Sequence, residues 1–487
     1  MRKYGIKFFE RFQGSEVKYG KLLRSWIFPL NSSGNQLGSG PLHKLFCLND
    51  YVGIGSNLMN IKQGGIMLNT TTVTTDEEKD YLHNKFRHLV AKITSKMTTR
   101  DDKKKMWRYL KKEWNDELNE MMGVDAEWGV PAGQLFSFDL DSRRKLVLLN
   151  YTQSAHNVLH ELGEGAGWTT ALRLMRGLVF AYERAGDPNG VRMVSRSFRK
   201  FFNTGEVPDS TWSSLIEDAG DKPVIVRAKE DGAMLQYFMH NGKLCATTRG
   251  RIETQYVDCA LGMFSIEDFN NAKHRASQHG IDLMTVVVEL VHPISKVHVD
   301  YDGEESAYLL AAYDHNGNEA PADVLEYIAL KVVEGGNTRI RMPNAMRMTL
   351  NDLKSEINDR TIENREGWVA FVGDGPKRRR VKFKYVTHIG DMVKSKLSYK
   401  YIMNCLRKER ANRMLDTLPE EIRDVAYNML ARVEKIAAES PSYKALYILH
   451  NENEGGRDYF RQVCRDYYRY RNPPSEAKPI PLQIFAA

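Results

Sequence analysis

The sequence predicts an α+β fold whose central domain is built on antiparallel sheets. Short runs of β-branched and aromatic residues recur between residues 132 and 390, and such runs are typical of strands. Asn241-Gly242 separates two of these runs, and this dipeptide favours the tight turn of a hairpin, so that the strands on either side are antiparallel. Helical patterns lie between other strands, at residues 265–279 and 321–334. These observations together indicate helices and antiparallel strands in one domain.

Residues 1–131 are interpreted as an N-terminal extension, to which the sequence assigns no function. This extension mixes apolar runs with Gly/Ser/Asn stretches, of which residues 31–35 are one. It ends in a charged segment that is predicted to be helical over residues 99–122. The apolar residues of this segment fall on one helical stripe, which predicts that they face a core: Met106, Leu110, Trp114, Leu118 and Met121.

The central domain, residues 132–390, is the part predicted to be rich in strands. The second of its predicted helices opens with Pro321 in the first turn, where the missing N–H costs nothing. The predicted strands cover residues 136–138, 177–180, 224–226, 234–238, 243–248, 285–291, 307–313 and 367–372.

Residues 391–487 are predicted to form an all-helical C-terminal domain. Thr417 to Glu420 matches a capping box with proline in the first turn of a helix. Arginines alternate with tyrosines between residues 461 and 471, which suits phosphate contacts and base stacking in RNA binding. A packed helix with exposed guanidinium groups explains that pattern equally well. The apolar stripe after the capping box consists of Ile422, Ala426, Met429, Leu430 and Val433.

The composition limits the classes of function. With 487 residues, of which 42% are hydrophobic, the chain is long enough for two or three domains with their own cores. Its net charge of +8 suits a polyanionic partner such as nucleic acid, although it also fits many soluble proteins without one. The five cysteines are scattered and show no CxxC spacing, so they indicate neither a disulfide framework nor a zinc site. We expect a cytoplasmic protein without a membrane partner, because no signal segment or membrane-spanning run is present in the sequence.

Lys229-Glu230-Asp231-Gly232 is the segment with the clearest chemical meaning. It follows the apolar run 224–226, so a lysine at the end of a buried strand is followed by acids and a glycine turn. Such a lysine, once uncharged, can form a covalent phosphoramide with a nucleotide. Burial or nearby cations are needed to favour the uncharged amine. The tetrapeptide alone is weak evidence, since it occurs by chance in many proteins.

Two pairs of charged residues would support that reaction. Lys382 and Lys384 alternate along a strand and so share one face, from which they can neutralise phosphate and disfavour a nearby ammonium group. The commoner interpretation of two such lysines is a solvated face. Glu289 and Glu366 would supply oxygens for ribose hydroxyls and for hydrated Mg²⁺. Glu289 stands in an apolar strand, where a carboxylate is costly to bury without a partner, and this favours a functional role.

The order of these residues resembles that of the covalent nucleotidyltransferases, the superfamily of ATP-dependent polynucleotide ligases and mRNA capping enzymes. The resemblance covers residues 134–392 and is most similar to the phage tRNA-repair RNA ligases. Its most specific part is a basic residue followed by Phe-Phe-Asn, here Lys200 to Asn203, shortly before the lysine nucleophile. The segments that resemble family motifs are residues 176–180, 195–203, 229–232, 247–250, 288–293, 366–369 and 381–384.

The resemblance implies an ATP-dependent RNA ligase that joins 5′-phosphate and 3′-hydroxyl ends in RNA repair. Lys229 would be the adenylylated nucleophile, Glu289 would hold the ribose, and Glu366, with Glu289 beside it, would hold the metal directly or through water. ATP and Mg²⁺, for which Mn²⁺ can substitute, are implied as cofactors. The implied partner is RNA, with nicked tRNA as one candidate, and the implied state is a monomer in the cytoplasm, that of the host if a phage encodes the chain.

The same resemblance assigns individual site residues. Arg249 stands where the family has a lysine, which keeps the charge but changes the contact. The residues implied to be catalytic are Lys229, Glu289, Glu366, Lys382 and Lys384. Those implied to contact ATP are Arg176, Lys200, Phe202, Lys229, Gly232, Arg249, Glu289, Lys382 and Lys384.

Two assignments stay open from the sequence. Tyr308 is the candidate for an aromatic residue that stacks on adenine, but Leu310 could occupy that place. The basic run 377–380 is either a solvated hairpin tip or a phosphate contact beside Lys382.

Other functions fit parts of the pattern. A DNA ligase and a capping guanylyltransferase use the same lysine chemistry, but both normally carry a five-stranded OB-fold after the last motif, and no such strand pattern is visible in this sequence. A catalytically inactive RNA-binding protein would keep the fold, although every charged catalytic position is filled here. Label transfer from ATP or from GTP separates these alternatives.

Overall fold

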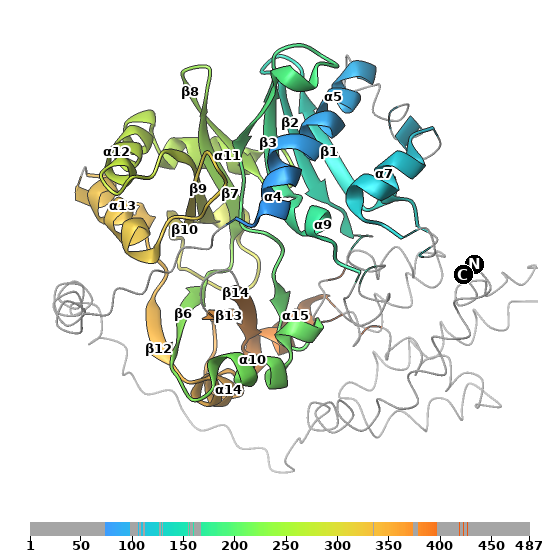
Figure 1. Ribbon diagram of the computed structural model, residues 1–487. Helices are drawn as coiled ribbons and strands as arrows, with labels where there is room; N and C mark the ends of the chain where they lie inside the picture. Colours follow the sequence, from blue (N-terminus) through green and yellow to red (C-terminus); the bar gives the residue numbers. More distant parts are fainter. Residues whose placement is uncertain are drawn as a thin grey trace, which may run out of the picture. The chain divides into compact units, whose positions relative to one another are not determined.

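The computed structural model divides the chain into two units, of which the larger covers residues 70–396. The described residues are 74–97, 106, 109–110, 113–125, 128, 130–153, 155, 159, 167–334, 336–373 and 378–396, with 418, 422 and 426 in the second unit (Figure 1). The helices predicted beyond residue 396 therefore lie outside the described residues, apart from those three positions.

Three sheets form the frame of the larger unit. The first sheet has the order β1-β2-β3-β4, the second β11-β10-β9-β7-β8 and the third β12-β6-β13-β14-β5 (Figure 1). The strands are β1 (Phe136–Asp141), β2 (Leu146–Tyr151), β3 (Arg176–Tyr182), β4 (Val191–Ser195), β5 (Phe202–Asn203), β6 (Val224–Lys229), β7 (Ala233–His240), β8 (Lys243–Thr248), β9 (Leu283–Val291), β10 (Ser306–Asp314), β11 (Ile340–Arg341), β12 (Ala345–Met348), β13 (Gly367–Val372) and β14 (Arg379–Lys384).

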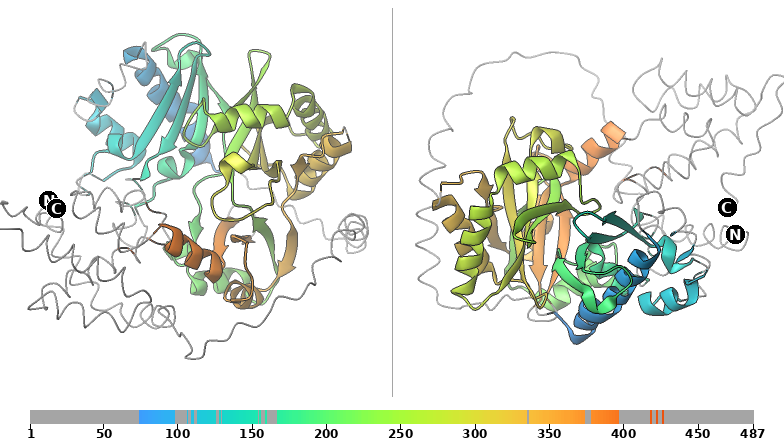
Figure 2. Two further views of the ribbon diagram at one scale, coloured as in Figure 1. Left: turned by 180° about the vertical axis from the view of Figure 1, so that it is seen from behind. Right: turned by 90° about the horizontal axis from the view of Figure 1, so that it is seen from above.

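Helices pack against each sheet. α5 packs against β3 and β4, α11 to α13 cover one face of the second sheet, and α10 packs beside β13 of the third (Figures 1 and 2). The α-helices are α4 (Asp76–Asp80), α5 (Phe86–Lys96), α7 (Asn115–Met122), α9 (Thr170–Leu174), α10 (Trp212–Ala219), α11 (Gln255–Met263), α12 (Ile266–Ser277), α13 (Ala322–Glu334), α14 (Leu350–Ile357) and α15 (Val386–Lys396). Shorter turns are the π-helix η1 (Tyr81–Lys85) and the 3₁₀-helices η4 (Ala132–Gln134), η5 (Pro188–Gly190), η6 (Pro208–Ser210) and η7 (Pro293–Ser295).

This arrangement confirms the predicted α+β class with largely antiparallel sheets. The hairpin between β7 and β8 turns at Asn241 and Gly242, and both have positive φ, as the tight turn requires. The exceptions to antiparallel pairing among the described strands are the two short contacts of β10 with β11 and of β14 with β5. None of the described helices combines the length and the apolar composition needed to cross a bilayer.

The predicted helix over residues 99–122 differs from the structure. The backbone leaves the helical conformation at Trp114, where φ is −121° and ψ is 21°, and α7 begins only after it. The buried positions lie four residues apart, at Met106, Leu110, Trp114, Leu118 and Met122, so that Met122 takes the buried place predicted for Met121. The tryptophan explains the break, because its indole N–H donates to Glu117 in the first turn of α7 while its ring is buried.

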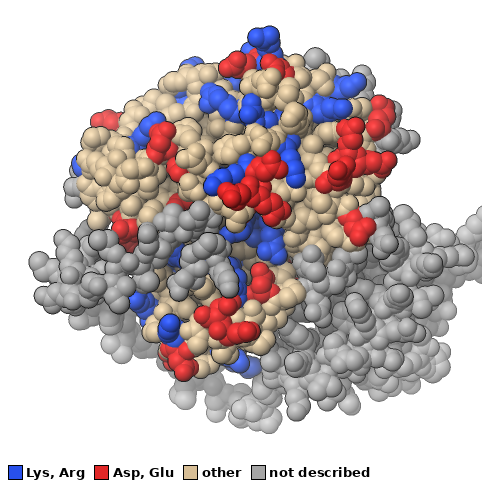
Figure 3. Space-filling model, in the orientation of Figure 1, with Lys and Arg blue, Asp and Glu red and all other residues tan. Residues whose placement is uncertain are grey.

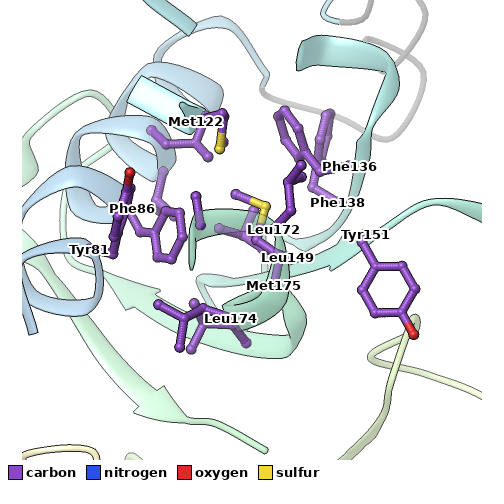
Figure 4. Close-up of a cluster of buried hydrophobic side chains, with 14 of the residues drawn as sticks. Tyr81, Phe86, Met122, Phe136, Phe138, Leu149, Tyr151, Leu172, Leu174 and Met175 are labelled. Atoms are coloured by element: carbon purple, nitrogen blue, oxygen red, sulfur yellow. The ribbon is translucent and has the colours of Figure 1, made fainter. Parts of the chain in front are cut away.

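One large core joins the helices before residue 131 to the first sheet. It includes Phe86 of α5 and Met122 of α7, which pack with residues of β1 and β2 (Figure 4). Phe86 also contacts Phe180 of β3, with ring centroids 6.5 Å apart. In Figure 4 Tyr151 lies at the margin of this core with its hydroxyl group directed away from it. Tyr151, the last residue of β2, therefore extends a polar group outward from the edge of this core.

Candidate active site

Lys229 is the last residue of β6, and a rigid turn follows it. The carboxylate of Asp231 accepts hydrogen bonds from the backbone N–H groups of His298 at 2.8 Å and Val299 at 2.9 Å. A Cβ on Gly232 would lie 2.2 Å from the carbonyl oxygen of Leu290, a distance that no side chain tolerates. The turn therefore needs an acid and then a glycine, and together they fix where β7 begins beside β9.

Lys229 points towards two other predicted site residues. Its Nζ lies 2.7 Å from one carboxylate oxygen of Glu366, whose other oxygen lies 2.9 Å from Nζ of Lys384. The strand register explains the contact, since Gly367 pairs with Lys229 on one side and with Lys384 on the other. Burial alone would raise the pKa of Glu366, but Lys229 and Lys384 outweigh it and lower that pKa to about 2. Glu366 is thus an anion shared by two lysines.

Glu289 faces the same group from the second sheet. It lies on β9 between Met234 of β7 and Tyr308 of β10. Burial raises the pKa of Glu289 to about 7, and Glu366 adds to this effect, while Lys229 and Arg176 oppose it. The two predicted carboxylates therefore differ, because Glu366 is firmly ionised and Glu289 changes its protonation near neutral pH.

This difference predicts a pH effect on stability. A carboxyl group with a raised pKa in the folded state stabilises the fold below the unfolded pKa, near 4.5, and loses that contribution as the pH rises through about 7. The wild-type protein should lose on the order of 2 kcal/mol of unfolding free energy as the pH rises through this window. Glu289→Gln cannot titrate, so its unfolding free energy should not show this loss. Thermal unfolding of both proteins at several pH values checks this, and parallel curves would contradict the assigned pKa.

Tyr301 holds the turn after Lys229. Its hydroxyl accepts a hydrogen bond from the N–H of Asp231 at 2.7 Å and donates one to Glu230 at 3.0 Å. The backbone of Asp300 exchanges two hydrogen bonds with the side chain of Asn364, each 2.7 Å long, just before Glu366. The loop after β9 therefore connects the segments that carry Lys229 and Glu366.

Tyr301→Phe is expected to weaken the turn without removing a charged group. Two partners lose their hydrogen bond, which costs about 1–2 kcal/mol of stability, and we expect nucleotide transfer to Lys229 to slow by about tenfold as the lysine loses its fixed position. Chemical denaturation and single-turnover labelling measure the two effects. Tyr256→Phe, in α11 and outside this loop, is the matched control, and equal behaviour of the two variants would refute the role of Tyr301.

Three predicted cations meet at Tyr151, a residue that the sequence did not single out. Arg249 donates to the Tyr151 hydroxyl at 3.0 Å, and Nζ of Lys200 lies 5.5 Å from the Tyr151 ring centroid. Burial lowers the pKa of Arg176, Tyr151 opposes this shift, and Arg249 adds to it. Residues 146–151 were not predicted to be a strand, although their apolar run is the signal that could have revealed β2 and placed Tyr151 at its end.

Lys200 and Phe202 lie in an aromatic cluster beside this tyrosine. Nζ of Lys200 is 5.0 Å from the ring centroid of Trp168 and 4.7 Å from that of Phe202. Phe202 is buried and packs edge-on against Trp168, with centroids 5.6 Å apart. The structure thus brings these two residues to Tyr151, and it places the Phe202 ring in the core.

The third sheet carries further basic residues beside Lys384. Nζ of Lys382 lies 5.1 Å from the ring centroid of Phe201. Of the basic run at 377–380, Arg379 forms an ion pair with Asp218 and Arg380 forms one with Glu319, both in partly buried positions. These two arginines are therefore held by acids, in contrast to a solvated hairpin tip. Figure 3 shows Lys and Arg atoms in the recess between the upper and lower parts of the described surface.

Of the two candidates for contact with the base, Tyr308 lies nearer the charged group. It pairs across the strands with Glu289, and its hydroxyl donates to Glu304 at 2.9 Å. Leu310 falls at a bulge in β10 and packs against the large core that contains Phe202. We therefore keep Tyr308 as the predicted stacking residue.

Two histidines that the sequence did not single out adjoin the site. His388 of α15 is buried, and its ring centroid lies 5.5 Å from that of His298. Burial lowers the pKa of His388, Glu366 opposes that shift, and Lys384 adds to it. Because the backbone of His298 also holds Asp231, this pair places α15 next to the lysine turn.

The acidic residues suit a cation that is held mainly by water and phosphate. Among the described residues no group of three or more His, Cys, Asp or Glu side chains could enclose a metal ion. Mg²⁺ in nucleotide sites commonly takes one or two carboxylates, with water and phosphate oxygens as its other ligands. Glu289 and Glu366 are compatible with that kind of binding.

Comparison with known proteins finds similarity to RNA ligases. Residues 174–369 match a family model described as RNA ligase, a span that includes Lys229, Glu289 and Glu366. A protein of Thermovibrio ammonificans with the name "Putative RNA ligase" is 24% identical over 292 residues, which are 55% of this chain and 70% of the relative.

Solved structures of RNA ligases are more distant. An archaeal ATP-dependent RNA ligase is 16% identical with a TM-score of 0.39, covering 72% of this chain and 97% of that chain. An RNA ligase of Naegleria gruberi, solved as a mutant with ATP and Mn, is 13% identical with a TM-score of 0.29. That match covers 38% of this chain and 56% of the Naegleria chain. The family model and the sequence relative therefore both indicate an RNA ligase.

Proposed function

We propose that this RNA ligase uses ATP to join RNA ends that carry a 5′-phosphate and a 3′-hydroxyl, through AMP bound covalently to Lys229. The observation that carries the proposal is the position of the Lys229 amine, 2.7 Å from a buried glutamate that a second lysine also contacts. A lysine so placed, at the end of a strand and before a turn that permits only glycine, is oriented for one defined reaction.

In the proposed first step the uncharged amine of Lys229 attacks the α-phosphate of ATP. A P–N bond forms and the P–O bond to pyrophosphate breaks. The ammonium proton is lost to water before the attack, and a second proton leaves the nitrogen to water as the phosphoramide forms. When Lys229 loses its charge, Glu366 still has Lys384 as a partner at 2.9 Å, so the buried carboxylate is not left unpaired. Lys382, Arg176 and the cations around Tyr151 then face the negative charge of the phosphates.

The next two steps transfer AMP and seal the strand. The 5′-phosphate of RNA displaces Lys229 from AMP, giving an adenylylated RNA end, and the 3′-hydroxyl then displaces AMP to form the phosphodiester. Glu289 is proposed to hold the ribose, and its pKa of about 7 allows it to accept or donate a hydrogen bond there.

A divalent cation is proposed to bind beside Glu366 and Glu289. We propose Mg²⁺, with Mn²⁺ as a substitute, because carboxylate and phosphate oxygens are ligands for both. When bound, the cation would withdraw charge from the phosphate under attack. The residues themselves orient the reacting groups, with Glu366 holding the two lysines in place.

The natural substrate is proposed to be a broken RNA, with nicked tRNA as the specific candidate. The net charge of +8 and the alternation of arginine with tyrosine near residues 461–471 support an RNA partner. We propose that the protein acts as a monomer in the cytoplasm, that of the host cell if a phage encodes it, in the repair of RNA.

Nucleotide labelling followed by a chase tests the proposal. The protein is incubated with Mg²⁺ and either ATP or GTP radiolabelled at the α-phosphate, then with 5′-phosphorylated RNA or DNA. Label from ATP that RNA discharges into a ligated product supports RNA ligation. Discharge by DNA would indicate a DNA ligase, and label from GTP a capping enzyme. Folded protein that is free of prior AMP and takes no label would indicate an RNA-binding protein of the same fold.

A further inference from the structure

Arg227 shares the face of the third sheet that carries Lys229. It lies two residues before Lys229 on β6, so both side chains project to the same side. The register places Arg227 in one row with Val369 and Lys382, next to the row of Lys229, Gly367 and Lys384. Adjacent rows are about 7 Å apart, which is two residues along a strand. Arg227 therefore lies next to the predicted reaction centre, although no motif includes it.

The guanidinium group of Arg227 is buried but incompletely bonded. The residue is 8% exposed, and its Nε has no hydrogen-bond partner among the described residues. Burying a charged group without an anion is costly, and arginine almost never gives up its proton to avoid that cost. Without a ligand, the buried guanidinium group of Arg227 therefore keeps a donor that has no acceptor. Such a group is suited to bind an anion.

The surroundings of Arg227 add positive charge to this place. Three guanidinium groups surround the ring of Phe371, with Arg227 5.4 Å, Arg378 4.7 Å and Arg380 5.1 Å from its centroid. Glu319 forms its ion pair with Arg380. Glu319 and Glu326 act on Arg227 through their charge, and Arg380 repels it. The ion pair between Glu319 and Arg380 therefore leaves Arg227 out.

We propose that Arg227, in one row with Lys382, forms a second phosphate subsite beside Lys229. The planar guanidinium group is suited to bind phosphate through two parallel hydrogen bonds, and phosphate would supply the missing acceptor of Nε. Two substrates could bring this phosphate: ATP with its outer phosphates, or RNA with a backbone phosphate. The assignment of these substrates rests on the proposed function, whereas the subsite rests on the geometry of Arg227.

Binding of two probes tests the subsite without requiring turnover. Sodium tripolyphosphate represents the outer phosphates of ATP, and a 5′-phosphorylated oligoribonucleotide represents RNA. The wild-type protein, Arg227→Gln, Arg227→Lys and the control Arg192→Gln, an exposed arginine on β4, are compared by calorimetry. We expect Arg227→Gln to bind at least one probe about ten- to a hundredfold more weakly. Arg227→Lys should recover part of the loss, because it keeps the charge and loses the planar fork.

The outcomes separate the two sources of phosphate. Weaker binding of tripolyphosphate alone assigns the subsite to ATP, weaker binding of RNA alone assigns it to RNA, and weakening of both assigns it to a shared position. Unchanged affinity for both probes would overturn the proposal, and so would wild-type protein that binds neither. If the protein binds the probes but never forms a covalent AMP adduct, the proposed function fails and the subsite stands.

Thermal unfolding without ligand separates a binding role from a structural one. A residue that is buried with an unsatisfied charge destabilises the protein on its own, so Arg227→Gln is expected to melt at the wild-type temperature or above it. Added tripolyphosphate or RNA should then raise the melting temperature of the wild type more than that of the variant. A variant that melts clearly below both the wild type and Arg192→Gln would mean that Arg227 holds the fold, and the proposal would be withdrawn.

Discussion

Lys229→Ala is expected to abolish covalent labelling by ATP, with a loss of about three orders of magnitude or more. The substitution removes the only atom that can form the proposed P–N bond at the end of β6, 2.7 Å from Glu366. Glu366 keeps Lys384 as its partner, so the variant should remain folded. Radiolabel on the denatured protein measures the first step, and circular dichroism checks the fold.

A second measurement on the same variant locates the defect. RNA supplied with AMP already on its 5′ end bypasses the lysine, so Lys229→Ala should still seal it, although more slowly. The control Lys222→Ala changes an exposed lysine shortly before the same strand and should behave as the wild type in both assays. Label on the Lys229→Ala protein would show that another residue is the nucleophile.

Gly232→Ala is expected to lower the activity by about a hundredfold, although no charge changes. The added Cβ would lie 2.2 Å from the carbonyl oxygen of Leu290, so β7 and β9 must separate or the turn must shift. Overpacking of this kind costs about 1–3 kcal/mol of stability. A displacement near 1 Å at the adjacent lysine lowers a rate by about a hundredfold. Single-turnover adenylylation and chemical denaturation measure the two effects.

Gly262→Ala provides a matched control for this change. Gly262 lies in α11, and a Cβ there would meet nothing within 4 Å. Alanine is the better helix former by about 1 kcal/mol, so the control should be neutral or slightly more stable. Similar activity of the two variants would mean that the contact with Leu290 is not what requires glycine at position 232.

The segments that carry Lys229, Glu289 and Glu366 could be predicted from the sequence because each lies at or near a strand end with a local signature. The contact between Lys229, Glu366 and Lys384 needs only the register of neighbouring strands. Their individual roles stay predictions until variants are measured. The sequence therefore predicts the charged residues of the site and their order along the chain.

Features that depend on packing between distant segments could not be predicted in this way. Tyr151 meets Arg249 across 98 positions of sequence, and no local pattern marks that contact. The register that sets Arg227 beside Lys382 is likewise a property of three paired strands. The break in the helix at Trp114 depends on a buried indole that itself belongs to the regular apolar stripe, and no glycine or proline marks the break.

The core shared by α5, α7 and the first sheet links these two helices mechanically to the site. Phe86 and Met122 belong to the same packed cluster as Phe202 and Tyr151, the residues around which Lys200 and Arg249 gather. Closely packed interiors transmit a change of volume to their neighbours. Inherited or engineered changes in these helices would therefore resemble active-site lesions in their phenotype, and a gene fragment cut at residue 132 would encode the reactive lysine without the helices that complete this core.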